Sequence, residues 1–191
     1  MTEVYVEHPA GWVGIPEGIP SDRWPSTRAW AAELVGSLQA DLGAPGDGAA
    51  DALRDYLEIV ADSRVEREAS RVYVWVESWT GPVYVADLVV EPREASAEAS
   101  LEELAGKGDP EAVEEPVLEP FVTDTGLTGI SSVRYFNTDG AGALIARQDY
   151  VWITSTDTVR LYTAQFDLVA FERSKPRLAA LARTVREVVA A

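Results

Sequence analysis

The sequence predicts an α+β protein, an α/β/α sandwich with a central, mainly antiparallel sheet of about six to seven strands and helices on both faces. Three observations support this fold class. Segments 131–138, 143–154 and 158–171 follow one another with the period-two alternation of β-strands, separated by turn residues. The last two segments are apolar on both faces, which indicates that both faces are covered. Segments with apolar residues at helical spacing lie before and after the strand-rich regions.

The three successive strands are expected to pair as hairpins. Val133 and Tyr135 alternate with Arg134 and Phe136, as in a strand that has two different faces. Asp139 and Gly140 form a typical hairpin turn, and residues 155–157 supply the second turn. Strands joined in this way run antiparallel.

Amphipathic helices are expected near both ends of the chain. The first follows Ser26, which is a typical N-cap residue, and a second covers about 49–61. The last is expected to begin near Ser174 and Pro176. The apolar positions that define the first and last helices are Trp30, Leu34, Leu38 and Leu42, and Leu178, Leu181, Val185 and Val188.

Further strands are predicted at 12–15, 71–79, 83–90 and 117–122. A short helix between the last two is indicated by Ser100 and Glu103, which have the spacing of a capping box. Residues 5–7 either pair at an edge or form a loose arm. Residues 62–69 either extend the second helix or form a charged loop.

Length and composition favour one globular domain over residues 1–191. Cysteine is absent and His8 is the single histidine, so thiol nucleophiles, zinc–thiolate sites and histidine-rich metal sites are excluded. We therefore expect no cofactor. The N-terminal sequence lacks a basic segment followed by an apolar one, and no apolar run is long enough to span a membrane, so a cytoplasmic location is expected.

The net charge of −16 bears on the choice of partner. Such a surface repels nucleic acid and anionic membranes, so neither is expected to bind. Segment 91–119 is an acidic, proline-containing crossover with ten acidic residues against Arg93 and Lys107, and it carries half of the net charge. It is interpreted either as a solvated surface or as a docking surface for a basic partner.

The opening segment 11–18 (Gly-Trp-Val-Gly-Ile-Pro-Glu-Gly) resembles the first strand of PsbP-like proteins. The layout is also similar: an early helix, a long antiparallel sheet and a closing helix after residues 167–171. This superfamily includes the extrinsic photosystem II protein P, a Ran-binding nuclear import factor and bacterial single-domain proteins. The resemblance implies an α/β/α sandwich and a binding or assembly role rather than an enzyme. Because the chain has no lipobox cysteine and no transit segment, the lipoprotein and thylakoid roles are not implied.

No sequence motif of a known catalytic site is present. His8 lies near the terminus, and neither a nucleophile elbow nor a phosphate-binding glycine loop occurs. Charged residues interrupt the strands, however, and buried charges need partners. If they converge at the margin of the sheet, they line a cleft; otherwise they form ordinary cross-strand ion pairs. These residues are Glu77, Asp87, Arg134, Arg147, Asp149, Arg160 and Asp167.

Two functions from different classes follow. The first is a non-enzymatic protein-interaction or adaptor module, with a surface of exposed aromatic residues beside acidic ones. Its candidate residues are Trp75, Trp79, Tyr84, Glu98, Glu102 and Glu103. The alternative is a small-molecule binder or a carboxylate-dependent hydrolase with a cleft at the sheet margin. The sequence favours the first, with another protein as the partner, and leaves the partner's identity and the oligomeric state open.

Overall fold

The computed structural model describes residues 2–64, 66–93, 99–138 and 142–189. The predicted turn at Asp139 and Gly140 lies outside these ranges. The strands are β1 (Thr2–Val6), β2 (Trp12–Gly14), β3 (Arg71–Val76), β4 (Val83–Pro92), β5 (Val117–Val122), β6 (Thr128–Asn137), β7 (Leu144–Ile153), β8 (Asp157–Gln165) and β9 (Val185–Val189). The helices are α1 (Thr27–Leu42), α2 (Ala49–Asp62), α3 (Leu101–Leu104) and α4 (Leu168–Arg183).

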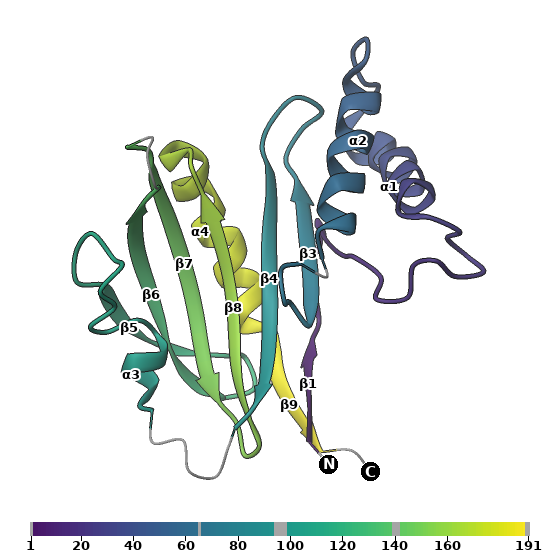
Figure 1. Cartoon of the computed structure of the whole chain (residues 1–191). Coiled ribbons are helices and arrows are strands. Elements are labelled where there is room, and N and C mark those ends of the chain that lie inside the picture. Colours follow the sequence, from purple (N-terminus) through teal and green to yellow (C-terminus); the bar gives the residue numbers. More distant parts are fainter. Residues whose placement is uncertain (1, 65, 94–98, 139–141, 190–191) are drawn as a thin grey trace.

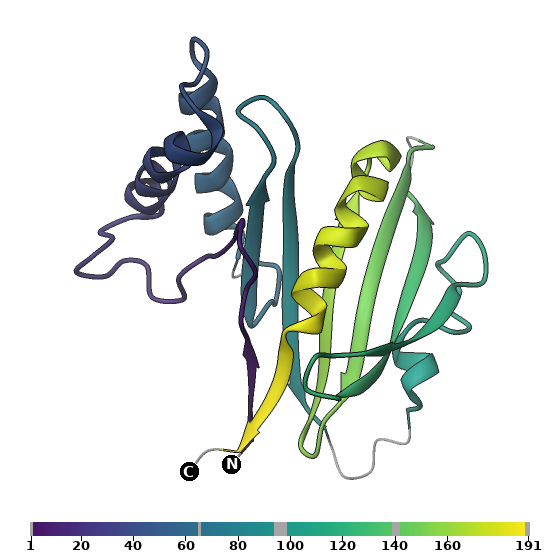
Figure 2. The same cartoon turned by 180° about the vertical axis from the view of Figure 1, so that it is seen from behind.

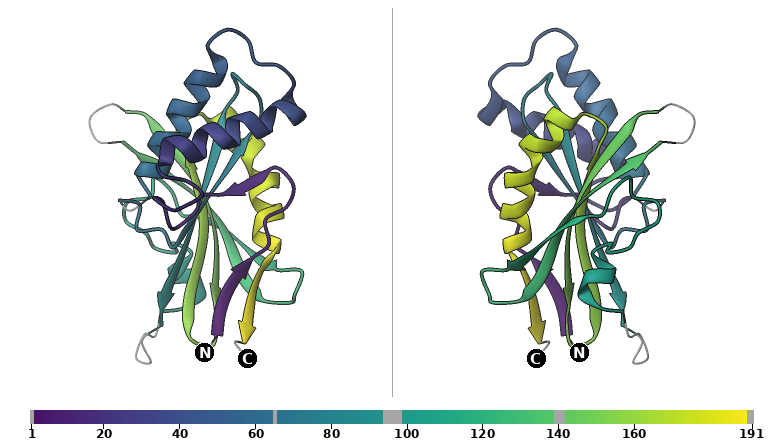
Figure 3. Two further views of the ribbon diagram at one scale, coloured as in Figure 1. Left: turned by 90° about the vertical axis from the view of Figure 1, so that its right-hand side faces the viewer. Right: turned by 90° about the vertical axis from the view of Figure 1, so that its left-hand side faces the viewer.

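Seven strands form one antiparallel sheet in the order β2-β3-β4-β8-β7-β6-β5 (Figure 1). The sheet has helices packed against it, so the predicted α+β fold class is confirmed. Helix α4 lies along one face (Figure 2), whereas α1 and α2 pack near the β3 end of the sheet. The side views show α1 and α2 at the upper end of the sheet and α4 along its length (Figure 3), and the two cores that these helices cover lie on opposite faces of β3.

Alternation along the strands builds two separate cores. On β3, Tyr73 belongs to a core under α4 that includes Leu178 and Trp152. Its neighbours Val72 and Val74 belong to the other core, which includes residues of α1 and α2. Because successive side chains of a strand point to opposite faces, one short apolar strand supplies both layers.

The C-terminal elements differ from the prediction at both ends of the last helix. The strand predicted over 158–171 ends at Gln165, because the Asp167 carboxylate accepts hydrogen bonds from the Val169 and Ala170 backbone amides and starts α4 there. Ser174, expected as the cap, is buried inside the helix and donates its hydroxyl hydrogen bond to the Phe171 carbonyl. The predicted N-cap position was therefore wrong.

The expected helical residues Val185 and Val188 lie in a strand instead. The segment Val185–Val189 forms β9 and pairs antiparallel with β1, from Thr2↔Val189 to Val6↔Val185. This two-stranded sheet resolves the alternative for residues 5–7, of which Tyr5 and Val6 lie in β1. In the described ranges, no helix combines the length and the apolar character that crossing a bilayer requires.

Strand β5 forms one edge of the main sheet, and Pro120 lies in the middle of it. Proline has no N–H to offer to an added strand, and edge prolines and charges limit edge-to-edge association. We expect Pro120→Val to shift the protein toward larger species with rising concentration, measured by analytical ultracentrifugation. Pro110→Val, outside the strand, is the matched control. Unchanged sedimentation of the Pro120 variant would show that another feature protects this edge.

Candidate functional site

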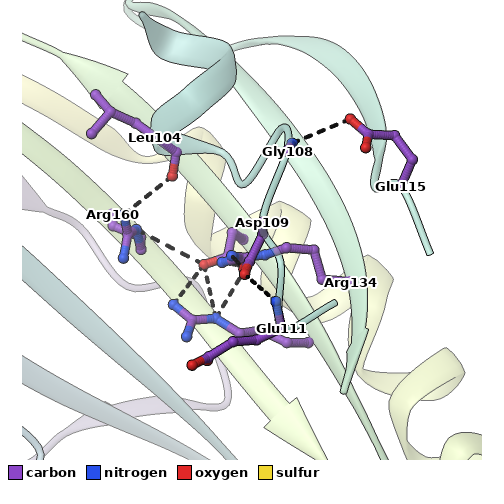
Figure 4. A network of polar contacts seen from close by, with 9 residues as sticks. Leu104, Gly108, Asp109, Glu111, Glu115, Arg134 and Arg160 are labelled. Atoms are coloured by element: carbon purple, nitrogen blue, oxygen red, sulfur yellow. Dashed lines mark hydrogen bonds and ion pairs between the residues drawn. The ribbon is translucent and has the colours of Figure 1, made fainter. Parts of the chain in front are cut away.

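Five charged residues converge on the sheet face opposite α4, and we call them the Asp149 cluster (Figure 4). Asp149 is fully buried, and its carboxylate lies 2.9 Å from Arg134 Nη2 and 2.8 Å from Arg147 Nη2. The Arg160 Nε lies 4.0 Å from the same carboxylate. Asp109 completes the cluster, with Oδ2 2.7 Å from Arg134 Nη1.

Strand register explains why these residues meet. Arg147 and Asp149 are two residues apart on β7 and therefore share a face. Arg134 on β6 is directly opposite Arg147, a like-charge pair that is unfavourable without a nearby counter-charge. Asp149 supplies that charge, so the cluster is balanced by the order of residues along three adjacent strands.

The acidic crossover is attached to the sheet through the same cluster. Arg160 Nη2 donates a hydrogen bond to the Leu104 carbonyl at 3.1 Å, and Asp109 binds Arg134 (Figure 4). Gly106 has a φ of 96°, and a Cβ there would lie 2.5 Å from Arg134 Cδ. Glycine is therefore needed for this close approach.

Burial lowers the pKa of Arg160. The neighbouring Arg147 and Arg134 also lower it, whereas Asp149 raises it.

A second ion pair lies on the same face. Arg67 Nη1 is 2.7 Å from Asp87 Oδ2, and Tyr162 stands between Asp87 and Asp149 in the strand register. The Arg147 guanidinium lies 3.9 Å from the centre of the Tyr162 ring, a cation–π contact. Arg67 belongs to the segment 62–69 whose role the sequence left open.

Burial raises the pKa of Asp87, although Arg67 and Tyr162 lower it. A carboxyl whose folded pKa is raised contributes stability that is fully present below its unfolded pKa and is lost as pH rises through its folded pKa. Relative to Asp87→Asn, the wild type is therefore expected to gain free energy of unfolding when the pH falls from about 7.5 to about 5. Urea denaturation of both proteins measures this difference.

The exposed Asp51 provides the control for loss of a paired carboxylate. It pairs with Arg54 on the surface of α2. At neutral pH, Asp51→Asn is expected to change the free energy of unfolding by no more than about 1 kcal/mol, as is usual for surface pairs. A wild type that loses stability relative to Asp87→Asn on acidification would contradict the raised pKa.

Two cavities lie at the margins of the sheet. One, of about 570 Å³, is beside the Asp149 cluster and is lined by Arg147, Glu111, Phe136, Asn137, Ile145 and Ala164. The other, of about 510 Å³, lies on the α4 face, and we call it the α4 groove. Strands β5, β6 and β7 and helix α4 form the α4 groove, and its lining includes Glu114, Val117, Glu119, Ser131, Val133, Tyr135, Gln148, Tyr150, Lys175, Pro176 and Ala179.

The α4 groove has a polar floor. Gln148 and Tyr150 are each 5% exposed, and Ser131 is 8% exposed. Burial raises the pKa of Tyr150 to about 12, opposed by Arg183 and supported by Glu119, so its hydroxyl stays protonated at neutral pH. The floor therefore combines an amide, a phenol and an alcohol in one concave surface.

The carboxylates proposed for a common cleft lie in three places. Asp87 and Asp149 share the face opposite α4. Glu77 lies 2.8 Å from Arg177 of α4 and accepts a hydrogen bond from the Tyr84 hydroxyl. Asp167 caps α4. Of the seven strand charges named from the sequence, Arg134, Arg147, Asp149 and Arg160 converge in one cluster.

The candidate aromatic and acidic residues do not form one surface. Tyr84 is fully buried, so its expected exposure was wrong; it packs in the core under α4. Trp75 is half-buried beneath the Arg177 guanidinium, and Trp79 packs on the other core and donates to the Gly43 carbonyl. Glu102 and Glu103 are exposed on α3. Glu98 lies outside the described residues.

Sequence reasoning missed Gln148 and Ser131 because it considered only charged interruptions of the strands. Both are uncharged polar residues on the strand face that carries Tyr150, a signal available from alternation alone. Across the described part of the chain, no three His, Cys, Asp or Glu side chains are arranged to hold a metal ion.

The geometry defines an α+β protein with a seven-stranded antiparallel sheet, a buried arginine–aspartate cluster on one face and a groove beside α4 on the other. In comparisons with known proteins, no family model matches the sequence, and no curated protein matches it.

Proposed function

We propose that the protein is a non-catalytic protein-interaction module, in which the α4 groove receives a basic segment of a partner protein. The observation that carries this proposal is the groove's buried floor of Gln148, Tyr150 and Ser131 under an acidic rim. The rim residues Glu114 and Glu119 come from the acidic crossover that the sequence offered as a docking surface.

A non-catalytic role is supported by the state of the strand carboxylates. Asp87, Asp149 and Glu77 are each paired with at least one arginine. Such pairing leaves them poorly placed to exchange protons with a substrate. An early helix, an antiparallel sheet and a late helix support a PsbP-like layout, although strand β9 follows α4. We propose membership of that superfamily, whose bacterial members resemble binding or assembly modules.

A small molecule is the second candidate occupant. The groove volume of about 510 Å³ falls within the range of about 300–1,000 Å³ that is typical of ligand sites. This alternative uses the same groove and the same floor residues, and differs only in the occupant, which is a small molecule instead of a segment of a partner protein.

Substitutions in the groove wall test the proposal. Ala179→Trp places a large side chain on the α4 wall of the groove, whereas Val169→Trp alters an exposed position of the same helix. With each protein as bait in an extract of the source cells, quantitative mass spectrometry is expected to find a partner with wild type and Val169→Trp. We expect at least about tenfold less of it with Ala179→Trp, a loss of about 1.4 kcal/mol in binding free energy.

Equal capture by Ala179→Trp would overturn the groove as the docking site. Circular dichroism and thermal unfolding check that both variants fold. Native mass spectrometry of the protein purified from the source cells distinguishes the second candidate, because a retained small molecule would appear with wild type and disappear with Ala179→Trp.

A further inference from the structure

The strand side of the α4 groove consists of two rows of residues that run from the rim on β5 to the floor on β7. One row joins Glu119, Ser131 and Tyr150, and the next joins Val117, Val133 and Gln148. Gln148 and Tyr150 are each 5% exposed, yet neither the Gln148 amide nor the Tyr150 hydroxyl belongs to the fully buried polar atoms that lack a partner in the described residues. Because both residues line the groove, their polar groups are available to a partner from outside the chain.

The groove is also unbalanced in charge. Glu114 and Glu119 have no ion-pair partner among the described residues. Lys175 is the cation in the lining, and its amine lies 2.9 Å from Glu172 Oε1; Arg183, outside the lining, is close enough to lower the pKa of Tyr150. With a net charge of −16 over the whole chain, the groove favours a cationic visitor.

Two arginine residues of the protein show how its own side chains bind a guanidinium group. Arg147 pairs with Asp149 while lying over the Tyr162 ring. Arg177 pairs with Glu77 while lying over the Tyr84 ring, at 5.4 Å from its centre. In both places, one carboxylate and one tyrosine ring hold a guanidinium group, which is planar and donates several hydrogen bonds in fixed directions.

The α4 groove presents the unpaired carboxylate of Glu119 beside the polar groups of Gln148 and Tyr150, whose ring packs against Phe121 and Trp152, and no arginine is among the described residues that line the groove. We infer that the α4 groove recognises the guanidinium group of an arginine side chain carried by the partner, with Glu119 as its counter-charge and the Gln148 carbonyl and Tyr150 hydroxyl as hydrogen-bond acceptors. This inference rests on the proposed function and names the chemistry of the partner's anchoring residue.

Three probes that differ in one property each test this inference. N-acetyl-arginine-N-methylamide carries a planar cation, the citrulline analogue is its neutral isostere, and the lysine analogue carries a cation that is not planar. In ¹H–¹⁵N NMR titrations of the full chain, the arginine probe is expected to shift the Gln148 side-chain amide and the surrounding strands. We expect it to bind at least about tenfold more tightly than the other two probes.

Matched variants locate the interaction. Glu119→Gln is expected to weaken binding of the arginine probe at least about tenfold. Glu111→Gln removes the same charge from the acidic crossover but lines the cavity beside the Asp149 cluster, and it should leave binding unchanged. Gln148→Leu is expected to weaken binding of the arginine probe with little change in the free energy of unfolding, because it removes a hydrogen-bond acceptor that lines the groove. A purely structural role for Gln148 predicts a loss of stability with unchanged binding.

The possible outcomes separate this inference from the function on which it rests. Equal or tighter binding of the citrulline probe would overturn recognition of a cation, and equal binding of the lysine probe would overturn recognition of a planar group. Absence of any shift at millimolar probe also overturns the inference. In each of these cases, loss of partner capture by Ala179→Trp would still support the groove as a docking site.

Discussion

Replacing Asp149 by asparagine is expected to lower the free energy of unfolding by about 3–5 kcal/mol. The substitution keeps the shape of the side chain but removes the negative charge that Arg134 and Arg147 share. Arg134 is itself 8% exposed in its side chain, so water cannot take over that role. The loss of stability reflects Arg147 left without its carboxylate and Arg134 left with Asp109 as its remaining counter-charge. Urea denaturation at neutral pH measures it.

The exposed ion pair between Glu102 and Lys107 is the control, since both side chains are about half exposed. Glu102→Gln is expected to cost under about 1 kcal/mol, as is usual for surface pairs. A loss of similar size for Asp149→Asn would show that the cluster is hydrated and contributes little.

A double-mutant cycle tests whether the cluster acts as a unit. Arg134→Met removes one of the two cations that share the Asp149 carboxylate, so the double variant with Asp149→Asn should be less destabilised than the sum of the single variants. Residues in one ion-pair network typically show coupling of about 0.5–3 kcal/mol. Because Arg134 also binds Asp109, faster hydrogen exchange of α3 and the following loop is expected in Arg134→Met.

The parts of the fold that the sequence predicted are those encoded by local patterns. The early helix stripe of Trp30 and Leu34 and the alternation in β6 and β7 depend on residues close together in the chain. Segment 166–171 continued the alternation of β8, so it was predicted as strand. The Asp167 side chain ends the strand by capping α4, and Phe166 is left 69% exposed.

Other features depend on partners far away in the sequence. Val185 fits the apolar spacing of the preceding helix, but it pairs with Val6 from the opposite end of the chain. The charges on β6, β7 and β8 were predicted to need partners, whereas their actual pairing is set by strand register. The sequence did not show that Asp109, from the acidic crossover, would bind Arg134.

Truncating Leu178 to alanine is the second change with a large expected effect, a loss of about 2–5 kcal/mol in the free energy of unfolding. Leu178 is fully buried between α4 and the sheet, where it packs in the core that includes Trp152 and Tyr150. Its removal leaves a cavity that a rigid sheet on one side and a helix on the other cannot readily close. Val169→Ala, at a 62% exposed position of the same helix, should change stability by no more than about 0.5 kcal/mol.

The same variant tests whether the two helical layers are independent. Leu57 of α2 is fully buried in the core on the other face, and Leu57→Ala should cost a similar amount. The sheet separates the cavity left by Leu178→Ala from the cavity left by Leu57→Ala. The two losses in the free energy of unfolding are therefore expected to add within about 0.5 kcal/mol in the double variant. Only Leu178→Ala removes support beneath the wall of the α4 groove, so the arginine probe should bind more weakly to it than to Leu57→Ala. Equal effects of both substitutions on the probe would mean that the groove does not depend on how α4 packs against the sheet.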